Sequence, residues 1–171
     1  MRFGQALPVS IAACSQMEGF LLRVFEQLHE LEAHVGQPLD VGEWTTVEQT
    51  RIDRFADVTD DLQWIHVDPE RAASGPFRTT VAHGFLTLRL LPSLCSSAFR
   101  IADTRTAMNY GLNRVRFPAP VPVGSRIRAA CKLIAYEPID NGAQLTIEVS
   151  VEREGAAKPV CVAELVSRRY L

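Results

Sequence analysis

The chain has 171 residues, of which 47% are hydrophobic and 22% are charged, and its formal net charge is −2. A length in this range suits one domain with one core. The near-neutral charge excludes the strongly basic surface that nucleic acid or an anionic membrane would require, and no apolar run is long enough to span a bilayer.

The cysteines and the N-terminal segment both favour a cytoplasmic protein. The four cysteines are widely spaced and form no C-x-x-C pair, a pattern typical of reduced, buried thiols. Near the N-terminus, charged and polar residues return too soon for the apolar core of a signal peptide. We therefore expect a cytoplasmic location.

A first helix is expected over residues 15–35. A Ser-x-x-Glu capping box opens it, its apolar residues recur at the helical period, and Gly36 should end it. This pattern predicts an N-terminal helical extension over residues 1–37, followed by a domain over residues 38–171.

A short strand and a second helix come next. The strand is expected over residues 42–47, and Thr46 and Gln49 have the capping-box spacing that opens a helix ending near Val58. The following segment, 59–80, shows no sustained period and indicates a long connection. Long ordered connections in compact domains are often functional.

Two further helical segments are predicted. Pro69 can start one turn of helix that runs to Ala73. Residues 83–100 are apolar on nearly every side, which is typical of a helix buried all round. Pro92 should kink this helix, because it removes a backbone hydrogen bond and crowds the preceding turn.

The remainder of the chain predicts strands. Hydrophobic alternation, the Asn141-Gly142 hairpin signal and a possible bulge at Gly111 place them over residues 106–117, 125–136, 145–152 and 160–170. Short connections favour an antiparallel sheet, and the apolar helix needs a surface to bury it. The expected class is therefore α+β: a single hot-dog fold, an antiparallel sheet wrapped around a long central helix, plus an extra N-terminal helix.

Asp61 and His66 are the first candidates for chemistry. They are five residues apart, so a regular helix or strand would separate their side chains. A bend in the connection can nevertheless bring a carboxylate and an imidazole to one water, where one accepts a proton and the other orients the water or returns a proton. The alternative is structural, with Asp61 capping a turn and His66 hydrogen-bonded in a half-buried position.

His83 and Gly84 precede the central helix. The first N–H groups of a helix lack intrahelical partners and carry partial positive charge, and Gly84 lets a ligand approach the backbone closely. A thioester carbonyl oxygen placed there would be polarised. The alternative is that Gly84 only allows close packing.

The stretch over residues 55–94, which contains DDLQWIH and AHG, resembles the hydratase motif of the MaoC-like dehydratases, also called (R)-specific enoyl-CoA hydratases. The resemblance implies that Asp61 and His66 are the catalytic pair. It also implies that the His83-Gly84 pair forms the oxyanion and substrate-binding site. Residues 109–124 also look like the strand and corner of that family, and the resemblance covers roughly residues 38 to 171.

The family implies an activity: hydration of a trans-2-enoyl thioester, carried by coenzyme A or an acyl carrier protein, to an (R)-3-hydroxyacyl thioester. No metal and no separate cofactor is expected, because coenzyme A is part of the substrate and the thioester is already electrophilic. The family also implies a homodimer or a dimer of dimers. Neither nucleic acid nor a membrane is an expected partner.

Two departures from the family pattern leave alternatives open. Asp60 replaces the glycine that precedes the catalytic aspartate, and Gln63-Trp64 replaces an Asn-Pro pair. The resulting Q-W-I-H form resembles a branch grouped with nodulation-protein-N-like sequences. The alternatives are a hot-dog acyl-CoA thioesterase and a catalytically inactive hot-dog binding module.

Other chemistry has weaker support. His66, Asp68 and His83 could ligate a metal, but no helical H-x-x-x-H pair or cysteine pair accompanies them. Cys95 lies inside the expected helix with no basic neighbour closer than Arg100, so a reactive thiolate is not expected. Two pairs of arginines could meet the phosphates of coenzyme A, or could form a solvated face: Arg114 with Arg116, and Arg126 with Arg128.

Overall fold

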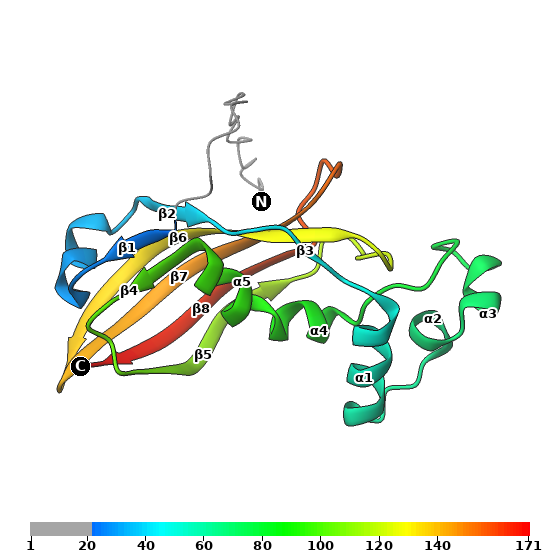
Figure 1. Ribbon diagram of the computed structural model, residues 1–171, viewed down its shortest axis with the longest axis horizontal. Helices are drawn as coiled ribbons and strands as arrows, with labels where there is room; N and C mark the ends of the chain where they lie inside the picture. Colours follow the sequence, from blue (N-terminus) through cyan, green and yellow to red (C-terminus); the bar gives the residue numbers. More distant parts are fainter. Residues whose placement is uncertain (1–21) are drawn as a thin grey trace, which may run out of the picture.

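The computed structural model describes residues 22–171. Its main feature is a curved antiparallel sheet in the order β2-β6-β7-β8-β5, with β3 also paired to β6 (Figure 1). The strands are β2 (Pro38–Val41), β3 (Thr45–Thr46), β5 (Thr106–Arg116), β6 (Arg126–Ile139), β7 (Gly142–Arg153) and β8 (Cys161–Tyr170).

The expected central helix lies along one face of this sheet (Figure 1). It consists of α4 (Gly84–Arg89) and α5 (Leu91–Ala98), joined by Leu90, whose backbone stays helical at φ −75° and ψ −15°. Pro92 produces the break, and it fits because it occupies the first turn of α5, where an N–H is not needed. The prediction that this helix is buried on all sides is wrong for the first turn of α4, where the side chain of Phe85 is 70% exposed.

The core lies between this helix and the concave face of the sheet. Alternation along the strands turns every second side chain inward, as the sequence predicts for β7. The fully buried residues include Leu91, Leu94, Ile127, Leu133, Leu145, Ile147, Val149 and Val151. The predicted hairpin is confirmed, since β6 ends at Ile139, β7 begins at Gly142, and Asn141 has φ +56°.

The N-terminal helix over residues 15–35 is wrong for its described part, and residues 15–21 lie outside the described residues. Residues Arg23–Phe25 form β1, which pairs in parallel with β4 (Phe99–Ile101), and Leu28–His34 form a 3-10 helix, η1. The two buried leucines of η1 are three residues apart, a spacing that α and 3-10 helices share.

Tertiary contacts explain this outcome. The carboxylate of Asp103 accepts the N–H of Leu28 at 3.0 and 3.1 Å, which fixes the start of η1. Phe25, Leu28 and Leu31 join the core of the sheet. The described part of the expected extension therefore packs on the domain, and its division from the rest at residue 37 stays a prediction.

The strand expected over residues 42–47 is interrupted. Gly42 still donates to the carbonyl of Ala129 in β6 at 2.8 Å, and its backbone passes close to α5, so that a Cβ there would lie 2.6 Å from the carbonyl oxygen of Leu94. The following helix, α1 (Gln49–Thr59), ends where the sequence predicts. Its N-cap, however, is Glu48 without a side-chain bond, so the predicted capping box is wrong.

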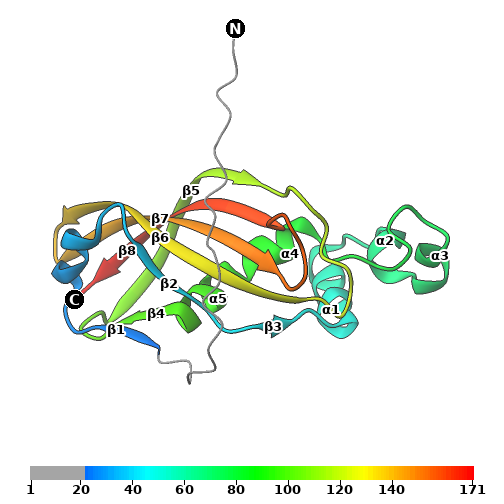
Figure 2. The same cartoon turned by 90° about the horizontal axis from the view of Figure 1, so that it is seen from above.

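Three short helices gather at one end of the molecule, beyond the sheet and close to the start of α4 (Figures 1 and 2). They are α1, α2 (Trp64–Val67) and α3 (Pro69–Ala73). The single turn expected from Pro69 is confirmed as α3. The connection between α1 and α4 carries the candidate site residues Asp61, His66 and His83.

Strand β5 forms the free edge of the sheet. Among the described strands it pairs only with β8. The expected irregularity at Gly111 is confirmed by a shift of register between Asn109 and Gly111. Nearly all of β5 is exposed, including Met108, Tyr110 and Leu112. No helix within residues 22–171 is both long and apolar enough to cross a membrane.

Candidate active site

The turn before Asp61 is formed by Asp60, which adopts the left-handed conformation at φ 55° and ψ 24° and caps α1. The N–H groups of Asp60 and Asp61 both bond to the carbonyl of Ala56, at 3.1 Å for Asp61. Aspartate tolerates this conformation better than most residues. Asp60 therefore makes the tight turn that glycine would otherwise make.

His66 lies in α2 and is 7% exposed. Its Nδ1 lies 2.6 Å from the carbonyl oxygen of Val81. Because a carbonyl only accepts, Nδ1 carries the proton and donates, and the neutral ring keeps a lone pair on Nε2. Burial lowers the pKa of His66 below its ordinary value of 6.5, and the bond to Val81 offsets only part of this effect. The ring is therefore neutral near pH 7 and can accept a proton.

The structure brings Asp61, His66 and His83 together. One polar side-chain atom of each lies within 4.8 Å of the other two. At this separation, a carboxylate oxygen and an imidazole nitrogen can both reach one water. The side chain of Asp61 is 58% exposed. The pair is thus open to solvent on the carboxylate side and buried on the imidazole side.

His83 supports the pair from within the molecule. Its Nε2 donates to the backbone carbonyl of Asp61 at 3.0 Å and lies 3.8 Å from the Asp61 carboxylate. Its ring stacks on that of His66, with centroids 3.6 Å apart and planes 25° apart. The side chain is 3% exposed, and Nδ1 is buried without a hydrogen-bond partner among residues 22–171. This position suits a residue that holds the other two in place.

The alternative metal site predicted from His66, Asp68 and His83 is wrong for Asp68, which does not lie with the two histidines. Asp68 accepts the N–H of Arg71 at 3.0 Å and caps α3. Asp61 stands with the two histidines instead. A carboxylate and two imidazoles are a ligand set that divalent cations accept, although each ring here already uses one nitrogen for a backbone carbonyl.

Gly84 is the first residue of α4 and borders a cavity of about 290 Å³, here called the near cavity, together with Ala82, Thr87 and Phe117. A Cβ on Gly84 would lie 3.2 Å from the ring of Phe117. The near cavity does not include Asp61 or His66 in its lining. A second cavity, of about 400 Å³, lies at the opposite end of α5.

Two residues that the sequence did not single out as site residues hold α2 in place. The Gln49 Nε2 donates to the backbone carbonyl of His66 at 2.7 Å, and the hydroxyl of Thr80 donates to Gln49 Oε1 at 2.5 Å. The N–H of Val81 also bonds to the carbonyl of Ile65 at 3.0 Å. These contacts fix the backbone on both sides of the His66 ring. Gln49 appeared in the sequence only as part of a capping signal, and Thr80 carried no signal.

The Gln63-Trp64 substitution has a structural role. Gln63 is the N-cap of α2, and Trp64 is its first residue. The guanidinium of Arg71 stands 4.6 Å above the Trp64 ring, and the absence of a side chain at Gly75 leaves room for that ring. Trp64 therefore packs α3 against α2, and the helix that carries His66 is retained.

The two arginine pairs differ in their surroundings. Arg126 and Arg128 stand over the ring of Trp44, and each pairs with a glutamate at 2.9 Å. Arg114 and Arg116 are exposed on the free edge strand β5. The first pair is engaged within the molecule, and the second is open to solvent.

Comparisons with known proteins give the family. The family described as MaoC like domain matches residues 30–155. The chain is 53% identical over 148 residues to 3-hydroxyacyl-thioester dehydratase Z of Mycobacterium tuberculosis, which covers 86% of this chain and 98% of that protein. It is 45% identical over 145 residues to nodulation protein N of Rhizobium leguminosarum bv. viciae, covering 82% and 89%.

A solved structure agrees with the fold. The (R)-hydratase from A. caviae involved in PHA biosynthesis superimposes with a TM-score of 0.63 at 22% identity, covering 78% of this chain and 94% of that chain. The sequence matches, the sheet wrapped around α4 and α5, and this likeness agree with one another. The chain therefore belongs to the MaoC-like dehydratase family and has its hot-dog fold.

Proposed function

We propose that the protein is a hydro-lyase that interconverts trans-2-enoyl and (R)-3-hydroxyacyl thioesters. The observation that carries the proposal is the placement of the Asp61 carboxylate beside the neutral, buried ring of His66, next to the start of the central helix. The 53% identity to a protein named 3-hydroxyacyl-thioester dehydratase supports it.

The reaction follows from this geometry. Asp61 and His66 hold one water between them, and the pair accepts a proton as the water oxygen attacks C3 of the enoyl group. The electron pair of the C2–C3 double bond moves toward the thioester carbonyl. A proton from the pair then reaches C2. Because water and proton come from the same side, the addition is syn, and the (R) configuration follows from family membership. Dehydration is the reverse.

Gly84 has a role at the carbonyl oxygen. Its N–H is at the first position of α4 and has no intrahelical partner. A thioester oxygen bound there would be stabilised as negative charge develops on it. The substrate supplies coenzyme A or an acyl carrier, and the proposed steps use no metal and no other cofactor.

His83 and Gln49 act as positioning residues in this proposal. His83 holds the backbone of Asp61 and the face of the His66 ring. Gln49 holds the backbone carbonyl of His66. Supporting hydrogen bonds and ring contacts of this kind keep catalytic groups within about half an ångström of their working geometry.

We also propose that the protein is a homodimer, or a dimer of such dimers. Strand β5 has an unpaired edge with exposed Tyr110 and Leu112. Beside it, the exposed rings of Phe85 and Phe117 meet edge to face, with centroids 6.2 Å apart. Such an apolar edge is typical of a surface that a second copy covers.

The proposal is tested by adding trans-2-enoyl-CoA to the protein and following the absorbance of the conjugated thioester, with a thiol-trapping dye in parallel. We expect the absorbance to fall without release of thiol, and the product to be the (R)-3-hydroxyacyl thioester. Release of thiol from saturated acyl-CoA would instead identify a thioesterase. Inactivity on enoyl thioesters of every chain length would identify a binding module.

A further inference from the structure

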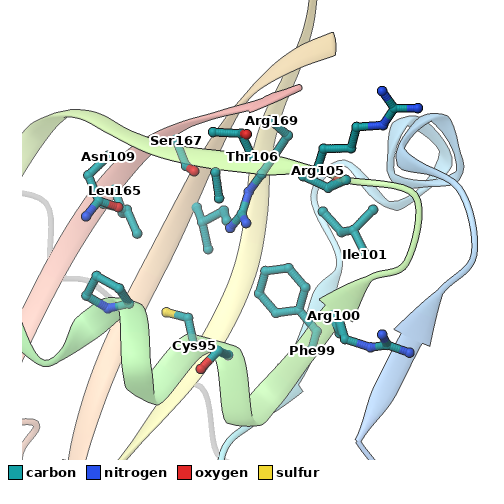
Figure 3. Close-up of a pocket in the computed structure, with 15 residues that line it drawn as sticks. Cys95, Phe99, Arg100, Ile101, Arg105, Thr106, Asn109, Leu165, Ser167 and Arg169 are labelled. Atoms are coloured by element: carbon teal, nitrogen blue, oxygen red, sulfur yellow. The ribbon is translucent and has the colours of Figure 1, made fainter. Parts of the chain in front are cut away.

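The cavity at the far end of the central helix, here called the far cavity, differs from the near cavity in its polar lining. Its volume is about 400 Å³, and it lies between α5, β5 and the last residues of β8. Figure 3 shows the guanidinium of Arg169 reaching into this space, whereas the side chains of Arg100 and Arg105 turn away from it.

The alternation of β8 explains why Arg169 points inward. Cys161, Ala163, Leu165 and Ser167 occupy every second position and are all buried. Arg169 is the next position on the same face. A packed core would have an apolar residue here, so the strand delivers a positive charge to the inner side of the sheet.

The guanidinium of Arg169 lacks a partner of opposite charge. Within residues 22–171, no carboxylate lies within ion-pairing distance of it, and its Nε is buried without a hydrogen-bond partner. The hydroxyl of Thr104 lines the same cavity and is also buried without a partner. Unpaired buried polar groups are costly and uncommon in folded proteins. Two of them facing one cavity indicate a ligand that supplies acceptor oxygens.

Two further cavities lie in a row between this cavity and the start of the helix, in the order of their lining residues along α4 and α5, and these two share no lining residue with each other. The near cavity contains Gly84 and Phe117. A middle cavity of about 260 Å³ follows, lined by Leu88, Leu91 and Leu112, and it shares Pro92, Asn109 and Leu165 with the far cavity. The numbering of the lining residues supports this order. From the near to the far cavity, residue numbers rise along α4 and α5 and fall along β5.

The length of the row fits an acyl chain. Gly84 and Cys95 are eleven positions apart, which is roughly 16 Å along a helix. Carbon–carbon bonds of about 1.5 Å advance a zigzag chain by little more than 1 Å each, so this distance corresponds to about a dozen bonds. A thioester bound at Gly84 would thus place the end of a medium-length acyl chain beside Arg169.

We propose that the far cavity recognises a carboxylate at the distal end of the substrate's acyl chain, so that the preferred substrates are ω-carboxyacyl thioesters. This inference rests on the proposed hydratase function. The planar fork of Arg169 matches a carboxylate with two parallel hydrogen bonds, and Thr104 can donate a further one. The middle of the chain lies against the leucines of the middle cavity.

The test compares two trans-2-enoyl-CoA substrates of about twelve carbons, one ending in a methyl group and one in a carboxylate. We expect kcat/KM to favour the carboxylate by roughly ten- to a hundredfold, the scale of a charge-assisted hydrogen bond. Arg169→Met should reverse this preference, and Arg169→Lys should retain part of it. Arg105→Met removes the same charge from an outward-facing residue and should leave the preference unchanged.

Two results would overturn the inference. One is an equal or greater kcat/KM for the methyl-ended substrate. The other is an equal loss on both substrates in Arg169→Met, which would assign Arg169 to the carrier's phosphates or to folding. Melting temperatures of each variant separate the latter two.

A binding measurement keeps this inference separate from the hydratase proposal. We expect dodecanoate to raise the melting temperature of the wild-type protein more than dodecan-1-ol does, and Arg169→Met to abolish the difference. This result would stand even if no enoyl thioester were hydrated, in which case the hydratase proposal alone would fail. No difference between the two ligands in the wild-type protein would contradict the inference.

Discussion

The two ends of the central helix differ in how their polar groups are satisfied. At the Gly84 end, a long connection builds the cluster, and the rings of His66 and His83 each donate to a backbone carbonyl, with only His83 Nδ1 left without a partner within residues 22–171. At the Arg169 end, the Nε of Arg169, presented by β8, and the hydroxyl of Thr104 are buried without a hydrogen-bond partner within residues 22–171. Acid–base catalysis needs groups already held in working geometry, whereas a binding pocket can leave groups for the ligand to satisfy.

The largest effect is expected at the Gly84 end, from Asp61→Asn. Loss of the carboxylate that holds the attacking water beside His66 should reduce kcat for enoyl-CoA hydration by about a hundredfold or more. The melting temperature should stay nearly constant, because this side chain is 58% exposed. Asp60→Asn is the matched control, since asparagine also tolerates the left-handed conformation. Near-normal hydration by Asp61→Asn would remove Asp61 from the mechanism.

A comparable loss is expected from His66→Asn, and the pH profile of the wild-type protein gives the role of the ring. The neutral ring accepts the proton, and burial lowers its pKa below 6.5. The rate should therefore be level around neutral pH and fall only as the pH drops through this lowered pKa. A rate that rises on acidification through the same range would show that the charged ring is the active form.

A smaller effect is expected from Gly84→Ala. The new Cβ would lie 3.2 Å from the ring of Phe117, so the ring or the backbone must shift at the proposed oxyanion site. A small misplacement there should reduce kcat by roughly tenfold. The melting temperature should fall by only a few degrees, because the partly exposed ring can move toward solvent. A lower melting temperature with unchanged turnover would leave Gly84 with a packing role alone.

Regular elements were predicted best from the sequence. The alternation of β7 and the apolar run over residues 83–100 each have one dominant period, and both elements appear in the structure. The helix expected over residues 15–35 failed in its described part because its apolar spacing also suits a 3-10 helix, and Asp103, far along the chain, fixes the start of η1.

The candidate site was predicted in part. The positions of Asp61 and His66 in a bent connection could be anticipated from the motif, and the structure brings them together. The support from Gln49 and Thr80 could not, because side chains 31 positions apart meet only after folding. Arg169 is a different case, because alternation along β8 places it on the inner face, and the sequence alone carries this signal.

The most direct test of the account is a double-variant cycle of Asp61→Asn and His66→Asn, measured as kcat for enoyl-CoA hydration. If both groups act on one water, removing the second should cost little once the first is gone, so the double variant should be about as slow as the slower single variant. If the two losses multiply instead, the groups act independently, and the shared-water mechanism is contradicted.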